Sequence, residues 1–301
     1  MKPAHLSLAR IFASALAAAL PIVASAACSS AGGLNGTPNC VDNPHTVPFT
    51  RDAAAPPDAG VDCYTLCHSG FCDLNADGKN VTCHTDCTGR RPEGLAVEEG
   101  ASPCTLGEYF AEIAHLEAAS IDAFRVLQGE LTRFRAPARL VHAARRARRD
   151  EERHVRLTSA LARRFGGTPR SPKVATPRAR TLVELAIENA VEGCVRETFG
   201  ALVAHYQARA ASDLEVRAAM ARIARDETAH AELAWRTHAW AMARLTRVER
   251  ARVRGAMHAA AHEILGRQAQ APDALTKGAG IPDPATSAVL AWSLHERLWA
   301  A

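Results

Sequence analysis

The chain has 301 residues, of which 48% are hydrophobic and only 5% aromatic, so it has room for one medium-sized domain with appendages. Its net charge of +4 is small for this length and argues against a dedicated nucleic-acid-binding protein, which would normally carry a strongly basic face. Alanine, leucine, arginine and glutamate are abundant and favour helices, so the composition predicts an all-α fold.

The N-terminus has the pattern of an export signal. Lys2 and Arg10 precede an apolar segment from Ile11 to Val23, which is followed by small residues. This predicts that residues 1–27 are a signal peptide that is removed, and no later segment reaches the length of a membrane span. We therefore expect an exported protein of the periplasm or cell envelope.

Two ways of processing this leader remain open. Cys28 directly follows Ser25-Ala26-Ala27 and precedes a flexible Ser/Gly stretch, which resembles the cleavage box of a bacterial lipoprotein. Ser25 stands where an aliphatic residue is usual in that box. Either Cys28 carries a lipid anchor to the membrane, or the mature chain is released after Ala26 without one.

Residues 28–104 form a Pro/Gly/Asp-rich segment with little helical periodicity and eight of the nine cysteines. Such a segment buries too little apolar surface to hold itself together, so we predict a small disulfide-stapled module. If Cys28 is lipidated, eight cysteines remain for pairing: Cys40, Cys63, Cys67, Cys72, Cys83, Cys87, Cys104 and Cys194. Their connectivity cannot be deduced from the sequence.

The cysteine spacings do not fit the common iron and haem motifs. Cys63-x3-Cys67 and Cys83-x3-Cys87 are each one residue too long for a rubredoxin knuckle, and His68 comes one residue too late for covalent haem. The segment Asp73–Gly78 copies only the first half of a calcium loop and is better explained as a turn between two short strands.

Helical patterns fill the rest of the chain, which we divide into a bundle at 105–245 and additional C-terminal helices at 246–301. The first helix begins at the capping box Thr105–Glu108 and runs to about Arg133, and the second begins at Pro137 and ends before Gly166. The stretch 166–176 lacks periodicity and is predicted to cross over the length of the bundle.

The third helix is predicted to begin near Pro177, and the fourth at the capping box Ser212–Glu215. A fifth begins at the box Thr246–Glu249, and a last one follows Asp283-Pro284, where Leu290, Leu294 and Leu298 are spaced to pack back on the bundle. Short connections within each helix pair and a long one between the pairs predict a four-helix bundle with one crossover.

Carboxylates and two histidines occupy core positions of these helices. Glu227-x-x-His230 and Glu151-x-x-His154 each place both side chains on one helix face, and Glu117 and Glu192 lie on the apolar stripes of the other two helices. The spacing between candidate ligands favours Glu192 over Glu188. In the first helix pair Glu151 follows Glu117 by 34 residues, and in the second Glu227 follows Glu192 by a similar 35.

Four buried carboxylates are costly unless cations neutralise them. Two divalent ions would do so, and oxygen with imidazole ligands suits iron or manganese. Asp150 and Asp226, each just before a ligand glutamate, are positioned to orient the histidine N–H groups. Glu188 remains a candidate for a supporting or shifting carboxylate.

This set of six resembles the ligands of the ferritin-like di-iron carboxylate superfamily, which includes ferritins, rubrerythrins and bacterial di-iron monooxygenases. Asp150-Glu151-x-Arg153-His154 also resembles the Asp-Glu-x-Arg-His pattern of the monooxygenases. The resemblance covers about Leu106 to Met242. It implies a metal site for two iron ions made by Glu117, Glu151, His154, Glu192, Glu227 and His230.

The same resemblance implies chemistry with dioxygen, peroxide or ferrous iron. We therefore predict an exported di-iron oxidoreductase that reduces peroxide or dioxygen or oxidises ferrous iron, and that depends on a separate electron donor because the chain lacks a rubredoxin-type domain. The alternative is a non-catalytic envelope scaffold or iron-binding protein whose dimetal site is structural.

Overall fold

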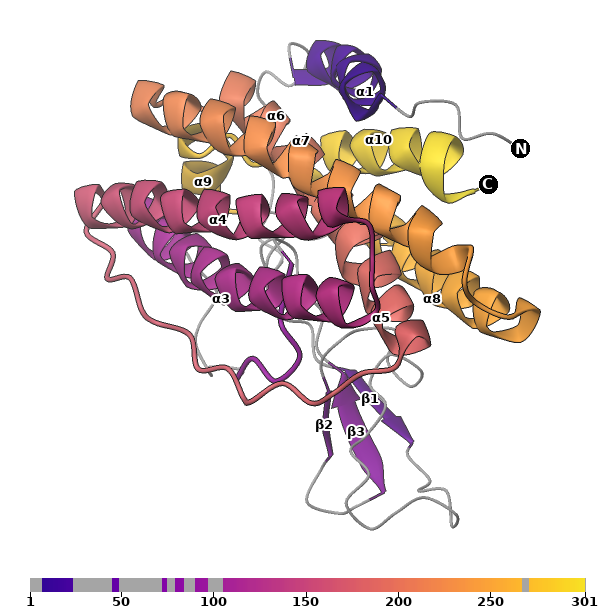
Figure 1. Cartoon of the computed structure of the whole chain (residues 1–301). Helices are drawn as coiled ribbons and strands as arrows, with labels where there is room; N and C mark the ends of the chain where they lie inside the picture. Colours follow the sequence, from indigo (N-terminus) through magenta and orange to yellow (C-terminus); the bar gives the residue numbers. More distant parts are fainter. Residues whose placement is uncertain are drawn as a thin grey trace.

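A computed structural model describes residues 7–23, 45–48, 72–74, 79–83, 90–96, 105–266 and 271–300. These residues are mostly helical, which confirms the all-α class, and a small sheet projects from the helices (Figure 1). Cys28 and most of the predicted cysteine-rich module lie outside the described residues. Cys194 is a buried free thiol, so it does not take part in the disulfide pairing that we considered for it.

Helices α3 (Leu106–Arg133) and α4 (Ala138–Arg164) form a hairpin that begins at the predicted capping box. The Thr105 hydroxyl accepts from the Glu108 amide at 3.2 Å, and the Glu108 carboxylate accepts from the Thr105 amide at 3.0 Å. Between the helices Arg135 adopts a left-handed φ of 52°, and Gly166 with φ 82° follows the end of α4. Both helices therefore begin and end close to their predicted positions.

The connection from Phe165 to Thr181 runs along the α3/α4 hairpin to its far end, as predicted for a crossover (Figure 1). The next helix begins later than expected. Thr181, rather than a residue near Pro177, caps α5 (Leu182–Glu188), because Thr181 and Glu184 form a capping box.

The third long helix changes its winding in the middle. After α5 the chain continues as a π-helix, η1 (Asn189–Glu197), and then as α6 (Thr198–Ala210). All nine residues of η1 are buried. A π-helix bonds residue i to i+5 instead of i+4, so side chains beyond it are rotated relative to a continuous α-helix.

Helix α7 (Leu214–Met242) packs against α6, η1 and α4. Its N-cap is Asp213, whose carboxylate accepts from the Glu215 and Val216 amides, and not the predicted Ser212. The predicted box at Thr246 is present before α8 (Arg247–Gly266). A short helix that the sequence did not suggest, α9 (Asp273–Gly278), follows.

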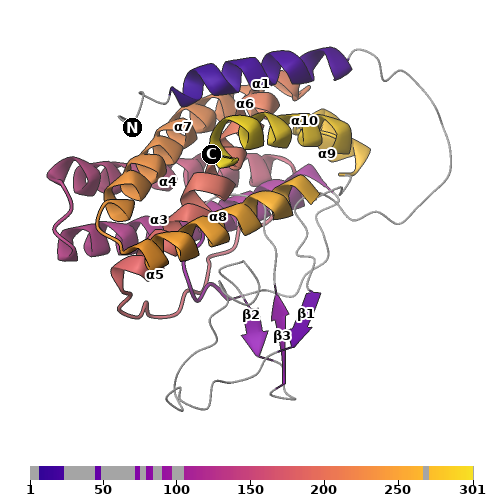
Figure 2. The same cartoon turned by 90° about the vertical axis from the view of Figure 1, so that its right-hand side faces the viewer.

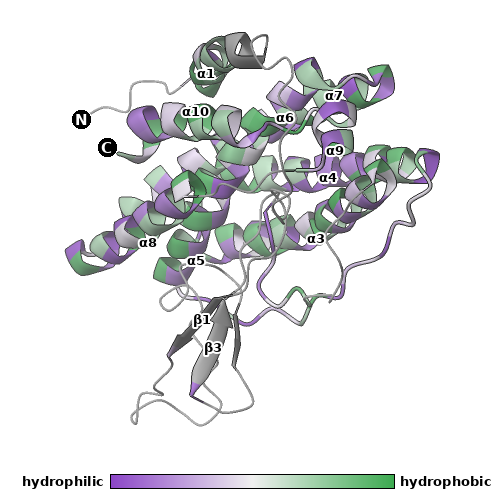
Figure 3. Ribbon diagram, turned by 180° about the vertical axis from the view of Figure 1, so that it is seen from behind, coloured by the Kyte–Doolittle hydropathy of each residue, from purple (hydrophilic) through white to green (hydrophobic). Residues whose placement is uncertain are grey.

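The C-terminal part ends with α10 (Pro284–Leu294), capped by Asp283 as expected, and a π-helical turn η2 (His295–Trp299). Leu290, Leu294 and Leu298 are buried in the main core, which confirms that this end packs back on the helices. Green apolar faces point between the helices in Figure 3, with purple polar faces outward.

The sheet contains β1 (His45–Pro48), β2 (Cys72–Leu74) and β3 (Asn80–Cys83) in the order β1-β3-β2, with antiparallel pairs. The turn predicted at Asp73–Gly78 is wrong for Asp73 and Leu74, which belong to β2, and its residues 75–78 lie outside the described residues. Figure 2 shows the sheet below the helices. The segment 90–96 then returns to the helices and pairs with the crossover, where the Ala96 amide donates to the Lys173 carbonyl at 2.8 Å.

The N-terminal helix α1 (Leu8–Val23) lies against α10 and α6. Its buried face includes Leu8, Phe12 and Leu16, which join the main core. Among the described helices, none is both long enough and apolar enough to cross a membrane. Removal of residues 1–27 as a signal peptide stays a prediction.

Candidate metal centre

Six buried side chains from α3, α4, η1 and α7 meet between the helices. They form two groups in which the candidate ligand atoms all lie within 4.8 Å of one another. The first group is Glu117, Glu151, His154 and Glu227. The second is Glu151, Glu197, Glu227 and His230. Glu151 and Glu227 belong to both groups.

Each histidine is oriented by an aspartate from the opposite helix. His154 Nε2 on α4 lies 3.3 Å from Asp226 Oδ2 on α7, and His230 Nε2 on α7 lies 3.4 Å from Asp150 Oδ2 on α4. Arg153 donates to Asp150 at 2.5 Å and to Asp226 at 3.1 Å. The two aspartates thus have the orienting role predicted for them, and they direct the Nδ1 atoms of both rings to the carboxylates.

Those Nδ1 atoms are buried and lack hydrogen-bond partners among the described residues. His154 Nδ1 lies 3.2 Å from a Glu227 oxygen, and His230 Nδ1 lies 3.1 Å from a Glu151 oxygen, but neither contact has hydrogen-bond geometry. Both carboxylate oxygens of Glu197 also lack a partner there. Orphaned buried donors and acceptors that converge in this way fit a metal ion.

No family model, curated protein or solved structure matches this chain. The chemistry of the site therefore has to be derived from its own donor atoms. These are carboxylate oxygens and imidazole nitrogens, the set that suits iron, manganese or zinc, and the buried groups could hold a metal ion.

The structure brings together five of the six residues that the sequence singled out: Glu117, Glu151, His154, Glu227 and His230. Glu192 belongs to neither group. Its carboxylate accepts from Arg196 at 2.7 Å, and both side chains are buried. Glu197 takes the position in the cluster that we predicted for Glu192.

The π-helix explains this exchange. We placed Glu192 in the core by assuming an uninterrupted α-helix, whereas η1 covers Asn189–Glu197 and rotates its end relative to its beginning. Glu197, the last residue of η1, faces α7, where its carboxylate oxygen is 3.8 Å from His230 Nδ1. A clue was present in Gly193, since glycine is unfavourable inside an α-helix.

Glu188, the other candidate on this helix, lies outside the cluster in a separate ion-pair network. Its two carboxylate oxygens accept from Arg90 at 3.0 and 2.7 Å, and Arg180 approaches at 3.8 Å. Arg90 also accepts a hydrogen bond at its carbonyl from Ser120 on α3. This network attaches the segment 90–96 to the helices beside the site.

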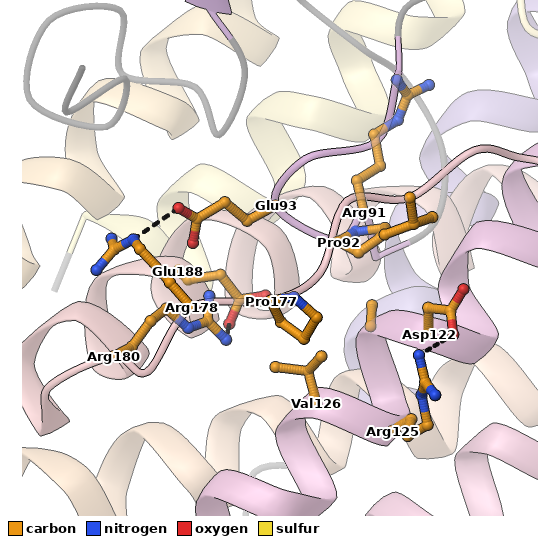
Figure 4. Close-up of a pocket in the computed structure, with 12 residues that line it drawn as sticks. Arg91, Pro92, Glu93, Asp122, Arg125, Val126, Pro177, Arg178, Arg180 and Glu188 are labelled. Atoms are coloured by element: carbon orange, nitrogen blue, oxygen red, sulfur yellow. Dashed lines mark hydrogen bonds and ion pairs between the residues drawn. The ribbon is translucent and has the colours of Figure 1, made fainter. Parts of the chain in front are cut away.

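Figure 4 shows the hollow at this junction, which has a volume of about 20 Å³. Arg178 points to Glu93 across the gap at 2.9 Å, and Asp122 pairs with Arg125 at 2.7 Å. Four of the charged side chains that line the hollow thus form two ion pairs. We regard it as a structural joint between the segment 90–96, the crossover and α3.

A different cavity, of about 40 Å³, adjoins the metal-type cluster and reaches Glu117 and Glu227. The rest of its lining is mainly apolar and comes from α3, α6 and α7: Tyr109, Phe110, Ile113, Gly200, Val203, Ala204, Gln207, Met220 and Ile223. A volume of this order holds a few water-sized molecules. A small molecule could therefore lie against the cluster.

Protons balance part of the negative charge of the cluster. Burial, together with repulsion from Glu151, raises the pKa of Glu117 well above its usual value. Burial raises the pKa of Glu197 to about 8, although the positive charges of His230 and Arg90 oppose that shift. The Glu197 carboxyl group is therefore largely protonated in the metal-free protein at neutral pH.

The two histidines are held in their charged form. Burial disfavours the charge on His154, but the carboxylates of Glu117 and Asp226 outweigh it and raise the pKa of the imidazole. Burial likewise opposes the charge on His230, whose pKa is raised well above its usual value by Glu227 and by hydrogen bonds to Asp150. Metal binding at Nδ1 must displace these protons.

We expect the metal-free protein to lose stability as the pH rises from about 5 to 9. Glu197 and both histidines have folded-state pKa values above their unfolded values of 4.5 and 6.5, so the folded state binds more protons than the unfolded state in this range. Thermal melts at several pH values measure this. The metal-loaded protein is the control and should show a flatter profile, because metal replaces the protons; equal slopes would contradict the proposed exchange.

Proposed function

We propose that this protein is an exported di-iron oxidoreductase of the ferritin-like superfamily that reduces peroxide or dioxygen or oxidises ferrous iron. The observation that carries the proposal is that the two groups of donors share Glu151 and Glu227. Two carboxylates common to adjacent sites suit bridging positions between two ions.

In this proposal each ion has one terminal carboxylate and one histidine. Glu117 and His154 would hold one ion, and Glu197 and His230 would hold the other. Four carboxylates match the charge of two divalent cations, which removes the energetic cost of burying them. Oxygen and imidazole ligands suit iron, with manganese as the alternative metal.

The helix arrangement supports the likeness to ferritin-like four-helix bundles. Helices α3 and α4 form one hairpin, and the helix from α5 to α6 forms another with α7. The long connection from Phe165 to Thr181 joins the two pairs. Each of the four long helical segments contributes at least one carboxylate to the cluster.

The residues of the chain would bind, orient and shield the metal ions. Asp150 and Asp226 fix the histidine rings, and burial of the six donor side chains keeps bulk water away. Two bound iron ions supply redox chemistry toward dioxygen or peroxide. The cavity of about 40 Å³ beside Glu117 and Glu227 offers room for an oxidant of that size.

Anaerobic loading with ferrous iron followed by peroxide or dioxygen tests the proposal. We expect binding of about two iron ions per chain, a ferric absorption band after oxidant is added, and repeated consumption of oxidant when reductant is supplied. The metal-free protein is the control for consumption.

Two other outcomes would speak against the proposal. Binding of two metals without any redox turnover would favour the alternative function, a scaffold or iron-binding protein with a structural dimetal site. An absence of metal binding would contradict both the oxidoreductase and the structural-site alternative.

The variant Val203→Trp, which narrows the cavity beside the cluster, should bind iron normally and consume oxidant more slowly.

A further inference from the structure

An unusual density of arginine covers the outer side of α4 and α7. Helix α4 carries nine arginines and three acidic residues, and no lysine. Four exposed arginines, which we call the arginine face, surround the half-buried Arg153: Arg146, Arg149, Arg156 and Arg222. Figure 1 shows α4 and α7 next to each other on the side that faces the viewer.

The arginine face lies directly over the histidines of the metal-type cluster. The contacts of His154 with Asp226 and of His230 with Asp150 show that α4 and α7 run antiparallel here, with Arg153 bonded to both aspartates. Helical spacing places Arg149 and Arg156 beside Arg153, and it places Arg222 beside Asp226. The surface is thus separated from each imidazole by one carboxylate.

The charge of the arginine face is not neutralised by the rest of the described chain. None of its four members forms an ion pair with a described residue. The acidic groups of α4 are engaged elsewhere: Glu152 with Arg148 at 4.0 Å, Asp150 with Arg153, and Glu151 in the cluster. A positive surface of this kind attracts an acidic partner.

We propose that the arginine face is the docking surface for an acidic one-electron carrier protein that reduces the metal site. This rests on the proposed function, since only a redox-active site needs such a donor. Docking here leaves Arg153, an aspartate and a histidine between the carrier and the carboxylates of the cluster.

An anionic membrane would also be attracted by arginine, but the face lacks an apolar anchor. The exposed large hydrophobic residues of the described chain are Leu214, Val248 and Trp292, and all lie outside the arginine face.

The electrons of the proposed peroxide reduction balance. Each encounter oxidises the carrier by one electron and reduces the site by one, so two encounters supply the two electrons that, with two protons, convert one peroxide to two waters.

The test compares two double variants, in each of which two arginines are replaced by glutamate. Arg149→Glu with Arg156→Glu removes the positive face, whereas Arg247→Glu with Arg252→Glu makes the same charge change on α8, which packs on η1 and α5 instead. The probe is a plant-type [2Fe–2S] ferredoxin, an acidic one-electron donor. Its binding is measured by calorimetry to both metal-free and iron-loaded protein at low and high salt.

We expect salt-sensitive binding that the first variant weakens by about tenfold and the second leaves within about twofold. Reduction of the loaded site by ferredoxin should slow in parallel, while reduction by dithionite, which needs no docking, should not change. Equal binding by the two variants would overturn the proposal. So would binding of phosphatidylglycerol vesicles or DNA at the face in preference to ferredoxin.

This design separates the docking proposal from the proposed function. If iron fails to load, or dithionite fails to reduce the loaded protein, the proposed function fails, and the docking proposal fails with it as a statement about electron transfer. If iron loading and dithionite reduction succeed but ferredoxin binding does not depend on the arginine face, only the docking proposal is wrong.

Discussion

Replacing Glu197 with alanine should remove at least one of two bound metal ions, whereas replacing Glu192 with alanine should leave the metal content unchanged. Glu197 has two buried carboxylate oxygens beside His230 that lack a hydrogen-bond partner among the described residues, so its removal takes away a donor. Glu192 is bonded to Arg196, outside both donor groups. Metal analysis of the two proteins after loading and desalting measures the difference.

For the free energy of unfolding of the metal-free protein, we expect the opposite order: Glu192→Ala should lower it, whereas Glu197→Ala should not. Removing Glu192 takes away the partner that lies 2.7 Å from the buried Arg196, and breaking a buried pair costs on the order of 3 kcal/mol. Removing Glu197 deletes a carboxyl group whose burial is itself unfavourable in the metal-free protein, so its metal-free form should unfold no earlier than the parent. Loss of metal from Glu192→Ala with retention in Glu197→Ala would reverse our assignment.

Replacing Arg90 with methionine should destabilise the protein by about 3–5 kcal/mol, because it leaves the Glu188 carboxylate buried without its main partner. Arg90 and Glu188 are both buried, and two hydrogen bonds join them. Arg180, at 3.8 Å, replaces only part of that interaction and is already bonded to Glu130. Urea unfolding of the metal-free protein measures the change.

Arg178 provides the matched control. It pairs with Glu93 and Glu184 at the same junction but is exposed, so Arg178→Met should cost less than about 1 kcal/mol. The double change Arg90→Met with Glu188→Met should recover much of the loss, since it removes the stranded charge. Equal effects of Arg90→Met and Arg178→Met would show that the buried pair does not hold the segment 90–96.

Local patterns were enough to predict most of the helices. The boxes at Thr105 and Thr246 and the cap at Asp283 depend on side chains that lie within four residues of the backbone groups they satisfy. The start near Pro177 was wrong because a better box occurs at Thr181. Helix α9, with six residues, is too short to leave a periodic signal.

The residues of the candidate site could be predicted on the helices that stay α-helical throughout. Glu151 with His154 and Glu227 with His230 are pairs three residues apart, and Glu117 lies on the uninterrupted stripe of α3. The assignment failed on the bundle helix that changes from an α-helix to a π-helix at Asn189. The Arg90–Glu188 pair was missed for another reason, since its members are 98 positions apart and no local pattern links them.

The π-helix also affects which acidic residue of this helix faces the cluster. One extra residue in an α-helix turns everything beyond it by about 100°, so the identity of the inward-facing acid on this helix depends on chain length as well as on residue type. Insertion or deletion of one residue within Asn189–Glu197 would therefore change which side chain faces the cluster, without any substitution.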